Sequence, residues 1–142
     1  MSSFSSICIV CMANYCRSPV GEHLLKNRFK SRNIISAGIN PLFDGDMDPR
    51  SRAFLNSNNI TFKTHTPKKI SSIIVNKYDL ILAMDVLVLM SLNRLFPSHK
   101  SKFKIFNFQN QNLSLRDPYK LNEEDYAEVM SNILKVSKEI KI

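Results

Sequence analysis

The residues best suited to chemistry in this sequence form one short run, Cys11-Met12-Ala13-Asn14-Tyr15-Cys16-Arg17-Ser18. A cysteine thiolate is a strong nucleophile, and the planar fork of an arginine can bind two oxygens of a phosphate group. A serine hydroxyl near the thiolate, here Ser18, can hydrogen-bond it and stabilise it as a leaving group. A cysteine and an arginine at this spacing therefore predict a loop that binds a phosphate and attacks it.

The sequence on either side of this loop predicts an anion-binding geometry. The almost wholly apolar run 6–10 predicts a buried strand, and Ser18-Pro19 predicts a helix with Ser18 as its N-cap and Pro19 as its first residue. A loop between a strand and a helix N-terminus turns several backbone N–H groups toward one point, and the helix dipole adds to their positive field. Such a field favours the thiolate form of a cysteine inside it.

A reaction through a thiolate also needs an acid for the departing oxygen and then a base for water, and Asp117 is the candidate. It stands in Asp117-Pro118-Tyr119, after the polar run 109–116 and before the last predicted helix. Proline disfavours helical geometry at the residue before it, so Asp117 can project over the edge of a sheet. An Asp-Pro pair alone is common in turns, so the assignment of Asp117 as the acid depends on the presence of the cysteine loop.

The rest of the chain alternates strands with helices. Further strands are predicted at 34–36 (closed by Ala37-Gly38), 78–84 and 103–106, and further helices at 48–57, at 85–97 and from Asn122 onwards. This alternation predicts a doubly wound α/β fold, a single domain over residues 1–142 with helices on both faces of a parallel sheet. In such sheets ligands bind beyond the carboxyl ends of the strands, the edge at which the cysteine loop is expected.

The three cysteines, Cys8, Cys11 and Cys16, are crowded near one end of the sequence, which is a poor disulfide framework. The sequence also shows no signal peptide and no apolar run near the roughly 18 residues of a membrane span. These features predict a protein of the reducing cytoplasm. Cys8 is expected in the core, whereas Cys16 is either inert or able to trap oxidised Cys11 as a disulfide.

The net charge of +8 indicates either an anionic partner or only solvated lysine-rich helix faces. Nucleic acid and a phosphorylated or acidic protein are the two classes of anionic partner. The basic residues are scattered, and no interleaving of aromatic and basic residues typical of single-strand binding is present. The prediction is therefore no nucleic-acid partner.

Further segments carry a family resemblance: Ser36-Ala37-Gly38, Asp48-Pro49-Arg50, the run 79–85 (DLILAMD) and Asp117-Pro118-Tyr119. With the Cys-x5-Arg-Ser-Pro loop, their order and spacing resemble the low-molecular-weight protein tyrosine phosphatases over essentially the whole chain. The resemblance implies a four-stranded parallel sheet flanked by helices. It also implies two-step hydrolysis of phosphotyrosine through a cysteinyl-phosphate, with no metal or other cofactor.

The resemblance also implies roles for individual residues. Cys11 would be the nucleophile, Arg17 the phosphate-binding arginine and Asp117 the general acid. Phosphate and substrate would be bound by Met12, Ala13, Asn14, Tyr15, Cys16, Ser18 and Tyr119. Asn14, Ser18, Ser36 and His65 match a polar network that holds the loop in shape, although a lone histidine is more often a surface or core residue.

The spacing between Ser36-Ala37-Gly38 and Asp48-Pro49, with Leu42 and Phe43 between them, most resembles a bacterial branch of the family. That branch is paired with tyrosine autokinases of capsule and exopolysaccharide assembly. The implied partner is a kinase with a phosphotyrosine-rich tail, which a basic enzyme suits electrostatically. A monomer or weak dimer without membrane insertion is expected.

The sequence departs from the family pattern at several positions, among them Arg116 directly before Asp117. Ala13 stands where glycine is usual, which would strain the loop if that position needed a positive φ angle. Tyr15 replaces a medium aliphatic residue, and Lys120 stands where some members carry a second aromatic residue. Tyr15 also argues against the phosphoarginine-specific relatives, which have a small threonine there.

Two other functions compete with hydrolysis. A thiol-dependent arsenate reductase on the same fold would need two more cysteines in the second half of the chain, and none follows Cys16. A non-catalytic module that binds phosphotyrosine needs no acid, and the presence of Cys11, Arg17 and Asp117 together argues against it.

Overall fold

Four parallel strands form the central sheet of the protein, which a computed structural model describes for residues 3–142. The strands are β1 (Ser6–Cys11), β2 (Asn33–Gly38), β3 (Leu80–Ala83) and β4 (Phe103–Ile105), in the spatial order β2-β1-β3-β4. Connections between parallel strands require crossovers, and each crossover here contains at least one helix.

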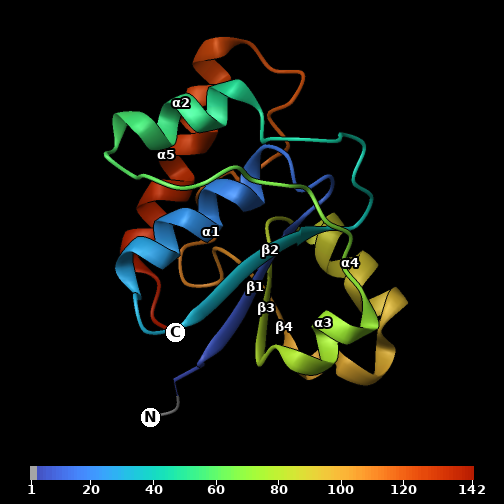
Figure 1. The fold of residues 1–142 in the computed structure, drawn as a ribbon. Helices are drawn as coiled ribbons and strands as arrows, with labels where there is room; N and C mark the ends of the chain where they lie inside the picture. The colour runs from blue at the N-terminus through green and yellow to red at the C-terminus, as the bar shows by residue number, and fades with distance from the viewer. Residues whose placement is uncertain (1–2) are drawn as a thin grey trace.

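The helices cover the sheet on both faces. They are α1 (Arg17–Arg28), α2 (Pro49–Ser57), α3 (Ser72–Lys77), α4 (Val86–Leu95), α5 (Glu123–Glu139) and the 3-10 helix η1 (Pro97–Lys102). Figure 1 shows α1, α2 and α5 on one side of the sheet and α3 and α4 on the other. This arrangement confirms the predicted doubly wound α/β fold. Among residues 3–142, no helix combines the length and the apolar character needed to cross a membrane.

Strand β1 lies between β2 and β3 and is buried on both faces, which explains its nearly continuous apolar sequence. Ile7 and Ile9 belong to the core that includes residues of α1 and α5, whereas Cys8 and Val10 belong to the core on the opposite face. Cys8 is fully buried, as expected, and burial raises the pKa of its thiol far above the ordinary value. Cys8 therefore remains a neutral core thiol.

Three predicted helix starts are confirmed by their caps. The side chains of Asp48, Asp85 and Asn122 each accept a backbone N–H from the first turn of α2, α4 and α5. Proline at the first position of α2 adds to its cap. The first turn of α5 is acidic, which matches the positive end of the helix dipole.

The predicted start of α1 was wrong by two residues. The helix begins at Arg17, and Cys16 is its N-cap residue without a side-chain hydrogen bond. Ser18 does not cap the helix because its hydroxyl hydrogen-bonds Asn14 and Cys11 instead. Helices α3 and η1 were not predicted. Each has six residues, too few for a hydrophobic period to show.

Candidate active site

Cys11 is the last residue of β1, and the loop 12–16 leads from it directly into α1. Its side chain is 3% exposed, and its Sγ atom lies 2.9 Å from the Oγ atom of Ser18 in the first turn of the helix. The thiol therefore lies beside the N-terminus of a 12-residue helix, where the dipole and free backbone N–H groups favour an anion.

Asn14 holds this loop together through four hydrogen bonds. Its Nδ2 atom donates to Ser18 Oγ at 2.8 Å and to Ser36 Oγ at 2.9 Å. Its Oδ1 atom accepts the backbone N–H of Lys68 at 3.0 Å, and its backbone oxygen lies 2.8 Å from His65 Nε2. Ser18 lies in α1, Ser36 in β2, and His65 and Lys68 in the segment after α2, so Asn14 connects the loop to three other parts of the fold.

The bond from Asn14 also decides the direction of the Ser18 hydroxyl. Since Asn14 Nδ2 can only donate, the Ser18 oxygen accepts, and its own proton is left for another partner. Cys11 Sγ at 2.9 Å is nearer than the Ala37 carbonyl at 3.5 Å. Ser18 is thus placed to donate to a Cys11 thiolate.

The strained position of the loop is Asn14 and not Ala13. Asn14 has φ of 54°, in the left-handed region that asparagine tolerates, and Ala13 has no positive φ. The strain expected at Ala13 is therefore absent. The nearby Gly38 of β2 has a different role, because a Cβ atom there would lie 2.8 Å from backbone atoms of both Ala13 and Asn14. Glycine at this position lets β2 end directly against the loop.

Glu22, which sequence reasoning missed, supports this network from behind. Its carboxylate accepts the Ser36 hydroxyl and also pairs with Lys26 Nζ at 2.6 Å. Burial raises the pKa of Glu22, but hydrogen bonds from Lys26 and Ser36 outweigh burial and hold that pKa below its usual range. The charged carboxylate orients the Ser36 hydroxyl so that its lone pairs face Asn14. A glutamate four residues before a lysine was the available signal.

His65 is 6% exposed and acts here as a donor. A carbonyl oxygen can only accept, so the Nε2 atom that contacts the Asn14 carbonyl carries the proton. Burial lowers the pKa of His65 despite the favourable contact with this carbonyl. A neutral imidazole is therefore the form that fits the loop at neutral pH.

Arg17 is 2% exposed, and within residues 3–142 one of its nitrogens forms hydrogen bonds. Its Nη1 atom donates to Asp85 Oδ2 at 2.6 Å and to the Leu115 carbonyl at 2.9 Å. Burial opposes the charge, but the attraction of Cys11 and Asp85 outweighs it and raises the pKa of Arg17. Within residues 3–142, Nε and Nη2 make no hydrogen bond and remain available for two oxygens of an anion. Asp85 was predicted only as a helix cap.

A cavity of about 90 Å³ opens above the loop. Its lining residues are Cys11, Met12, Ala13, Tyr15, Cys16, Arg17, Leu42, Phe43, Asp117 and Tyr119. Asp117 is exposed, and its Oδ1 atom accepts the backbone N–H of Tyr119 at 3.1 Å. The fold thus places Asp117 at the same cavity as Cys11 and Arg17, although it is distant from both in the sequence.

Three aromatic rings form the rim of the cavity. Tyr15 stacks on Phe43 with ring centroids 4.0 Å apart, and Tyr119 meets Tyr15 edge-on at 6.0 Å. Arg50 donates to the Tyr119 carbonyl at 2.9 Å and also pairs with Asp48, which fixes the rim to α2. The sequence indicated Phe43 only as a residue between two family motifs and did not predict that it stacks on Tyr15.

Cys16 lies beside the cavity but is 5% exposed. Burial raises the pKa of its thiol to about 12, and its backbone carbonyl accepts the Ser51 hydroxyl at 2.8 Å. Cys8, Cys11 and Cys16 are all free thiols. In the described part of the chain, no three His, Cys, Asp or Glu side chains are grouped so that they could hold a metal ion.

The site residues expected from the sequence therefore come together in two layers. Eight of them line the cavity, namely Cys11, Met12, Ala13, Tyr15, Cys16, Arg17, Asp117 and Tyr119. The other four, Asn14, Ser18, Ser36 and His65, form the hydrogen-bonded layer behind the loop. Lys120 is exposed and does not line the cavity.

Comparison with known proteins finds a family that covers most of the chain. The family described as low molecular weight phosphotyrosine protein phosphatase matches residues 6–140. The low molecular weight protein-tyrosine-phosphatase Wzb of Salmonella typhi is 30% identical over 126 residues, which are 89% of this chain and 85% of the relative.

Two solved structures are also similar. The tyrosine phosphatase AmsI of Erwinia amylovora has a TM-score of 0.90 at 28% identity, covering 96% of this chain and 91% of the other. The tyrosine phosphatase Wzb of Escherichia coli K30 in complex with sulphate has a TM-score of 0.89 at 32% identity, covering 96% and 95%. The chain thus belongs to the low-molecular-weight protein tyrosine phosphatases.

Proposed function

We propose that the protein hydrolyses phosphotyrosine through a phosphate ester of Cys11. The observation that carries this proposal is the shared cavity, in which Cys11, Arg17 and Asp117 surround a space of about 90 Å³ with Ser18 behind the sulfur. The fixed backbone N–H groups of the loop and the free edge of Arg17 would bind the phosphate oxygens. Preorganised donors of this kind stabilise the charge that spreads over the transferred group.

In the first step, the Cys11 thiolate attacks phosphorus and the bond from phosphorus to the tyrosine oxygen breaks. Asp117 gives its proton to the departing oxygen, so that tyrosine leaves neutral. In the second step, the Asp117 carboxylate takes a proton from water, and the water oxygen attacks phosphorus. The sulfur–phosphorus bond breaks, inorganic phosphate leaves, and the thiolate returns to its hydrogen bond with Ser18.

The proposed substrate is the phosphotyrosine-rich tail of a bacterial tyrosine autokinase that controls exopolysaccharide or capsule production in the same cytoplasm. The aromatic rim of Tyr15, Phe43 and Tyr119 supports this, because flat rings suit the stacking of a phenyl group. The net charge of +8 supports it as well, since it attracts a multiply phosphorylated tail.

The test of the nucleophile uses Cys11→Ser and a phosphotyrosine peptide. We expect turnover to be lost while the peptide still binds, because the loop and Arg17 remain. Acid-quenched wild-type protein should carry one phosphoryl group on the peptide that contains Cys11, as read by mass spectrometry. Retained turnover in Cys11→Ser would exclude the mechanism.

The test of the acid uses Asp117→Asn and two substrates with different leaving groups. We expect the kcat/KM for phenyl phosphate, which reports the first step, to fall by about 10²- to 10⁴-fold. The loss of kcat/KM should be much smaller for p-nitrophenyl phosphate, whose phenolate leaves without a proton, whereas kcat should fall for both substrates because they share the second step. Equal losses of kcat/KM for both substrates would remove Asp117 from the role of acid.

A non-catalytic phosphotyrosine-binding module remains the second candidate. It is favoured by one observation, the many fixed contacts that prepare the loop to bind an anion without any substrate present. Wild-type protein that binds the phosphotyrosine peptide tightly without hydrolysing it would establish this candidate and exclude the enzyme.

A further inference from the structure

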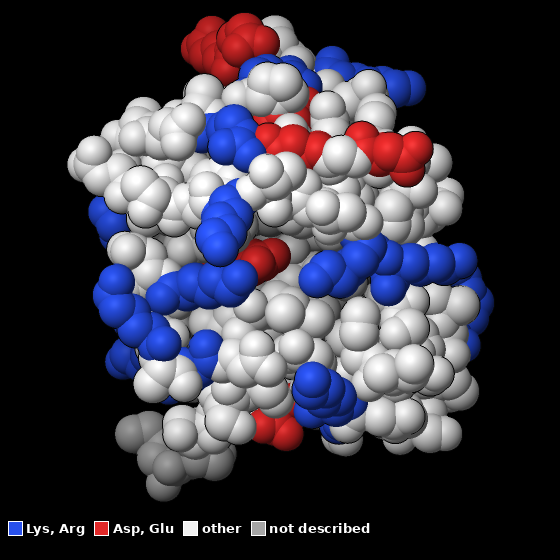
Figure 2. All heavy atoms as spheres, viewed as in Figure 1, with Lys and Arg blue, Asp and Glu red and all other residues white. Residues whose placement is uncertain are grey.

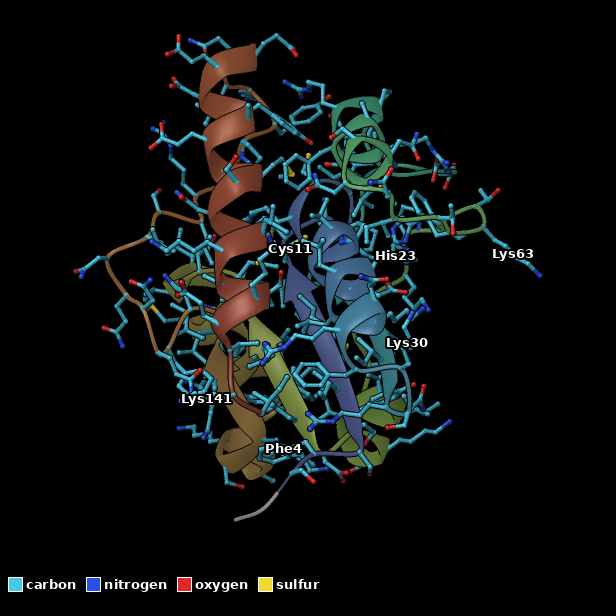
Figure 3. All side chains as sticks on the ribbon, turned by 90° about the vertical axis from the view of Figure 1, so that its left-hand side faces the viewer. Phe4, Cys11, His23, Lys30, Lys63 and Lys141 are labelled. Atoms are coloured by element: carbon cyan, nitrogen blue, oxygen red, sulfur yellow. The ribbon has the colours of Figure 1, made fainter. Side chains whose placement is uncertain are left out.

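A second and much larger cavity, separate from the 90 Å³ cavity, lies between α1 and the segment 59–68. Its volume is about 710 Å³, and none of its lining residues belongs to the 90 Å³ cavity. Figure 3 shows His23 on the side of α1 that faces this segment, Lys30 just beyond the end of α1, and Lys63 on the segment itself. A cavity of this size can accommodate a small molecule.

The charge of this cavity is strongly positive. Four lysines line it, and Lys26 is paired with Glu22. The other three, Lys30, Lys63 and Lys68, form no salt bridge within residues 3–142. Seen from the side of Figure 1, where the segment passes in front of α1, Lys and Arg side chains spread across the middle of the face (Figure 2).

The aromatic wall of the cavity is already in contact with protein side chains. His23 stacks on Phe62 with ring centroids 4.4 Å apart, and the Arg52 guanidinium lies 4.6 Å from the centre of the same ring. The Phe62 ring is therefore engaged by two cationic or polar side chains of the protein itself. A ligand would therefore be recognised by its charge and not by stacking of a base.

Three of the lining residues are also connected to Asn14 in the phosphate loop. His65 contacts its carbonyl, and the backbone N–H of Lys68 contacts its side-chain oxygen. Glu22 reaches Asn14 through the Ser36 hydroxyl. A ligand that shifts this wall therefore also shifts the residues that orient Ser18 toward Cys11.

From these observations we propose that the cavity between α1 and the segment 59–68 binds a small anion with two or more phosphate groups and that binding inhibits the phosphatase. Lys30, Lys63 and Lys68 provide the positive charge. The anion competes with Glu22 for Lys26, which weakens the chain of hydrogen bonds through Ser36 to Asn14. Its charge also opposes the binding of a phosphorylated substrate. The effect on activity rests on the proposed function, whereas binding itself does not.

The histidines allow binding to be tested on the unmodified protein. The chain has three, of which His23 and His65 line the cavity, and His99 lies in η1 and contacts Asn76. In an NMR titration with inorganic tripolyphosphate, we expect the imidazole signals of His23 and His65 to move and those of His99 to stay. The NMR titration measures binding without catalytic turnover, so its result remains valid even if the proposed function is wrong. Unmoved His23 signals would overturn the proposal.

The second arm measures inhibition of p-nitrophenyl phosphate hydrolysis by tripolyphosphate at constant ionic strength. We expect a fall in kcat that saturating substrate does not relieve. In Lys30→Ala/Lys63→Ala, inhibition should need at least about fivefold more tripolyphosphate. The basal kcat/KM of this double variant should remain within about twofold of wild type, because neither lysine side chain contacts the phosphate loop.

The matched control removes two lysines from the exposed side of α5, in Lys135→Ala/Lys138→Ala. This control should keep both the inhibition and the His23 shift of the wild type, although it loses the same net charge. Purely competitive inhibition that is unchanged in Lys30→Ala/Lys63→Ala would show that tripolyphosphate binds only at Cys11, and the proposal would be wrong.

Discussion

The guanidinium of Arg17 lies 2.6 Å from the carboxylate of Asp85, and this contact uses one of its three nitrogens. The Leu115 carbonyl accepts a hydrogen bond from the same nitrogen, so the described residues 3–142 hold the guanidinium through this one nitrogen. The edge formed by Nε and Nη2 is left with the geometry that suits two phosphate oxygens. Asp85 thus orients Arg17 without occupying its binding edge.

This relationship predicts that charge alone cannot replace Arg17. In Arg17→Lys the positive charge remains, but a single ammonium cannot contact Asp85 and two phosphate oxygens together. We expect kcat/KM for p-nitrophenyl phosphate to fall by about 10²-fold or more. Arg94→Lys, at the exposed end of α4, is the control and should behave as wild type. An active Arg17→Lys enzyme would show that bidentate binding is unnecessary.

The role of Asn14 can be divided between its backbone and its side chain. Asn14→Gly keeps the left-handed conformation but removes the bonds to Ser18 and Ser36, whereas Asn14→Ala also adds the cost of a positive φ. We expect both variants to lose about tenfold or more in kcat, because Ser18 is no longer oriented. In thermal unfolding, Asn14→Ala should be less stable than Asn14→Gly by about 1 kcal/mol. Full activity of Asn14→Gly would mean that only the conformation matters.

The buried His65 predicts a dependence of stability on pH. Its pKa in the folded protein is lower than the ordinary value of 6.5, mainly because of burial. The unfolded chain therefore binds a proton more readily, so this contribution to stability is complete above pH 6.5 and is lost as the pH falls through the folded pKa. The free energy of unfolding should decline across this window.

The measurement is urea unfolding of wild type and of His65→Gln at several pH values. Glutamine can still donate to the Asn14 carbonyl but does not titrate, so its profile should be flatter than that of wild type. Some dependence of stability on pH should remain in His65→Gln, because burial also lowers the pKa of His23. Parallel profiles for the two proteins would contradict the assigned role of His65.

Tyr15 is predicted to recognise the substrate ring and not the phosphate. In Tyr15→Ala the stack on Phe43 is lost, and KM for a phosphotyrosine peptide should rise about 2- to 10-fold. Competitive inhibition by inorganic phosphate should not change, because this ligand has no ring. Tyr15→Phe keeps the ring and should bind the peptide like wild type. Equal effects on peptide and phosphate would instead point to a distorted loop.

The sequence by itself indicated the candidate catalytic residues and determined the type of fold. Cys11 ends an apolar strand and Arg17 and Ser18 begin the next helix, and because this spacing is local it could be read without coordinates. The caps at Asp48, Asp85 and Asn122 are local as well, because a capping side chain bonds to a residue two or three positions away. Such short-range patterns keep their meaning in any fold that contains them.

Only the tertiary structure decided which groups support the loop. Three hydrogen bonds join segments that are separate in the sequence: Arg17 to Asp85, Ser36 to Glu22, and the backbone N–H of Lys68 to Asn14. The last of these also uses a main-chain group, which every residue type carries. No residue type or spacing marks such pairs, because packing of the sheet and helices brings them together. The same reason applies to the cavity beside α1, whose two walls become neighbours only in the folded protein.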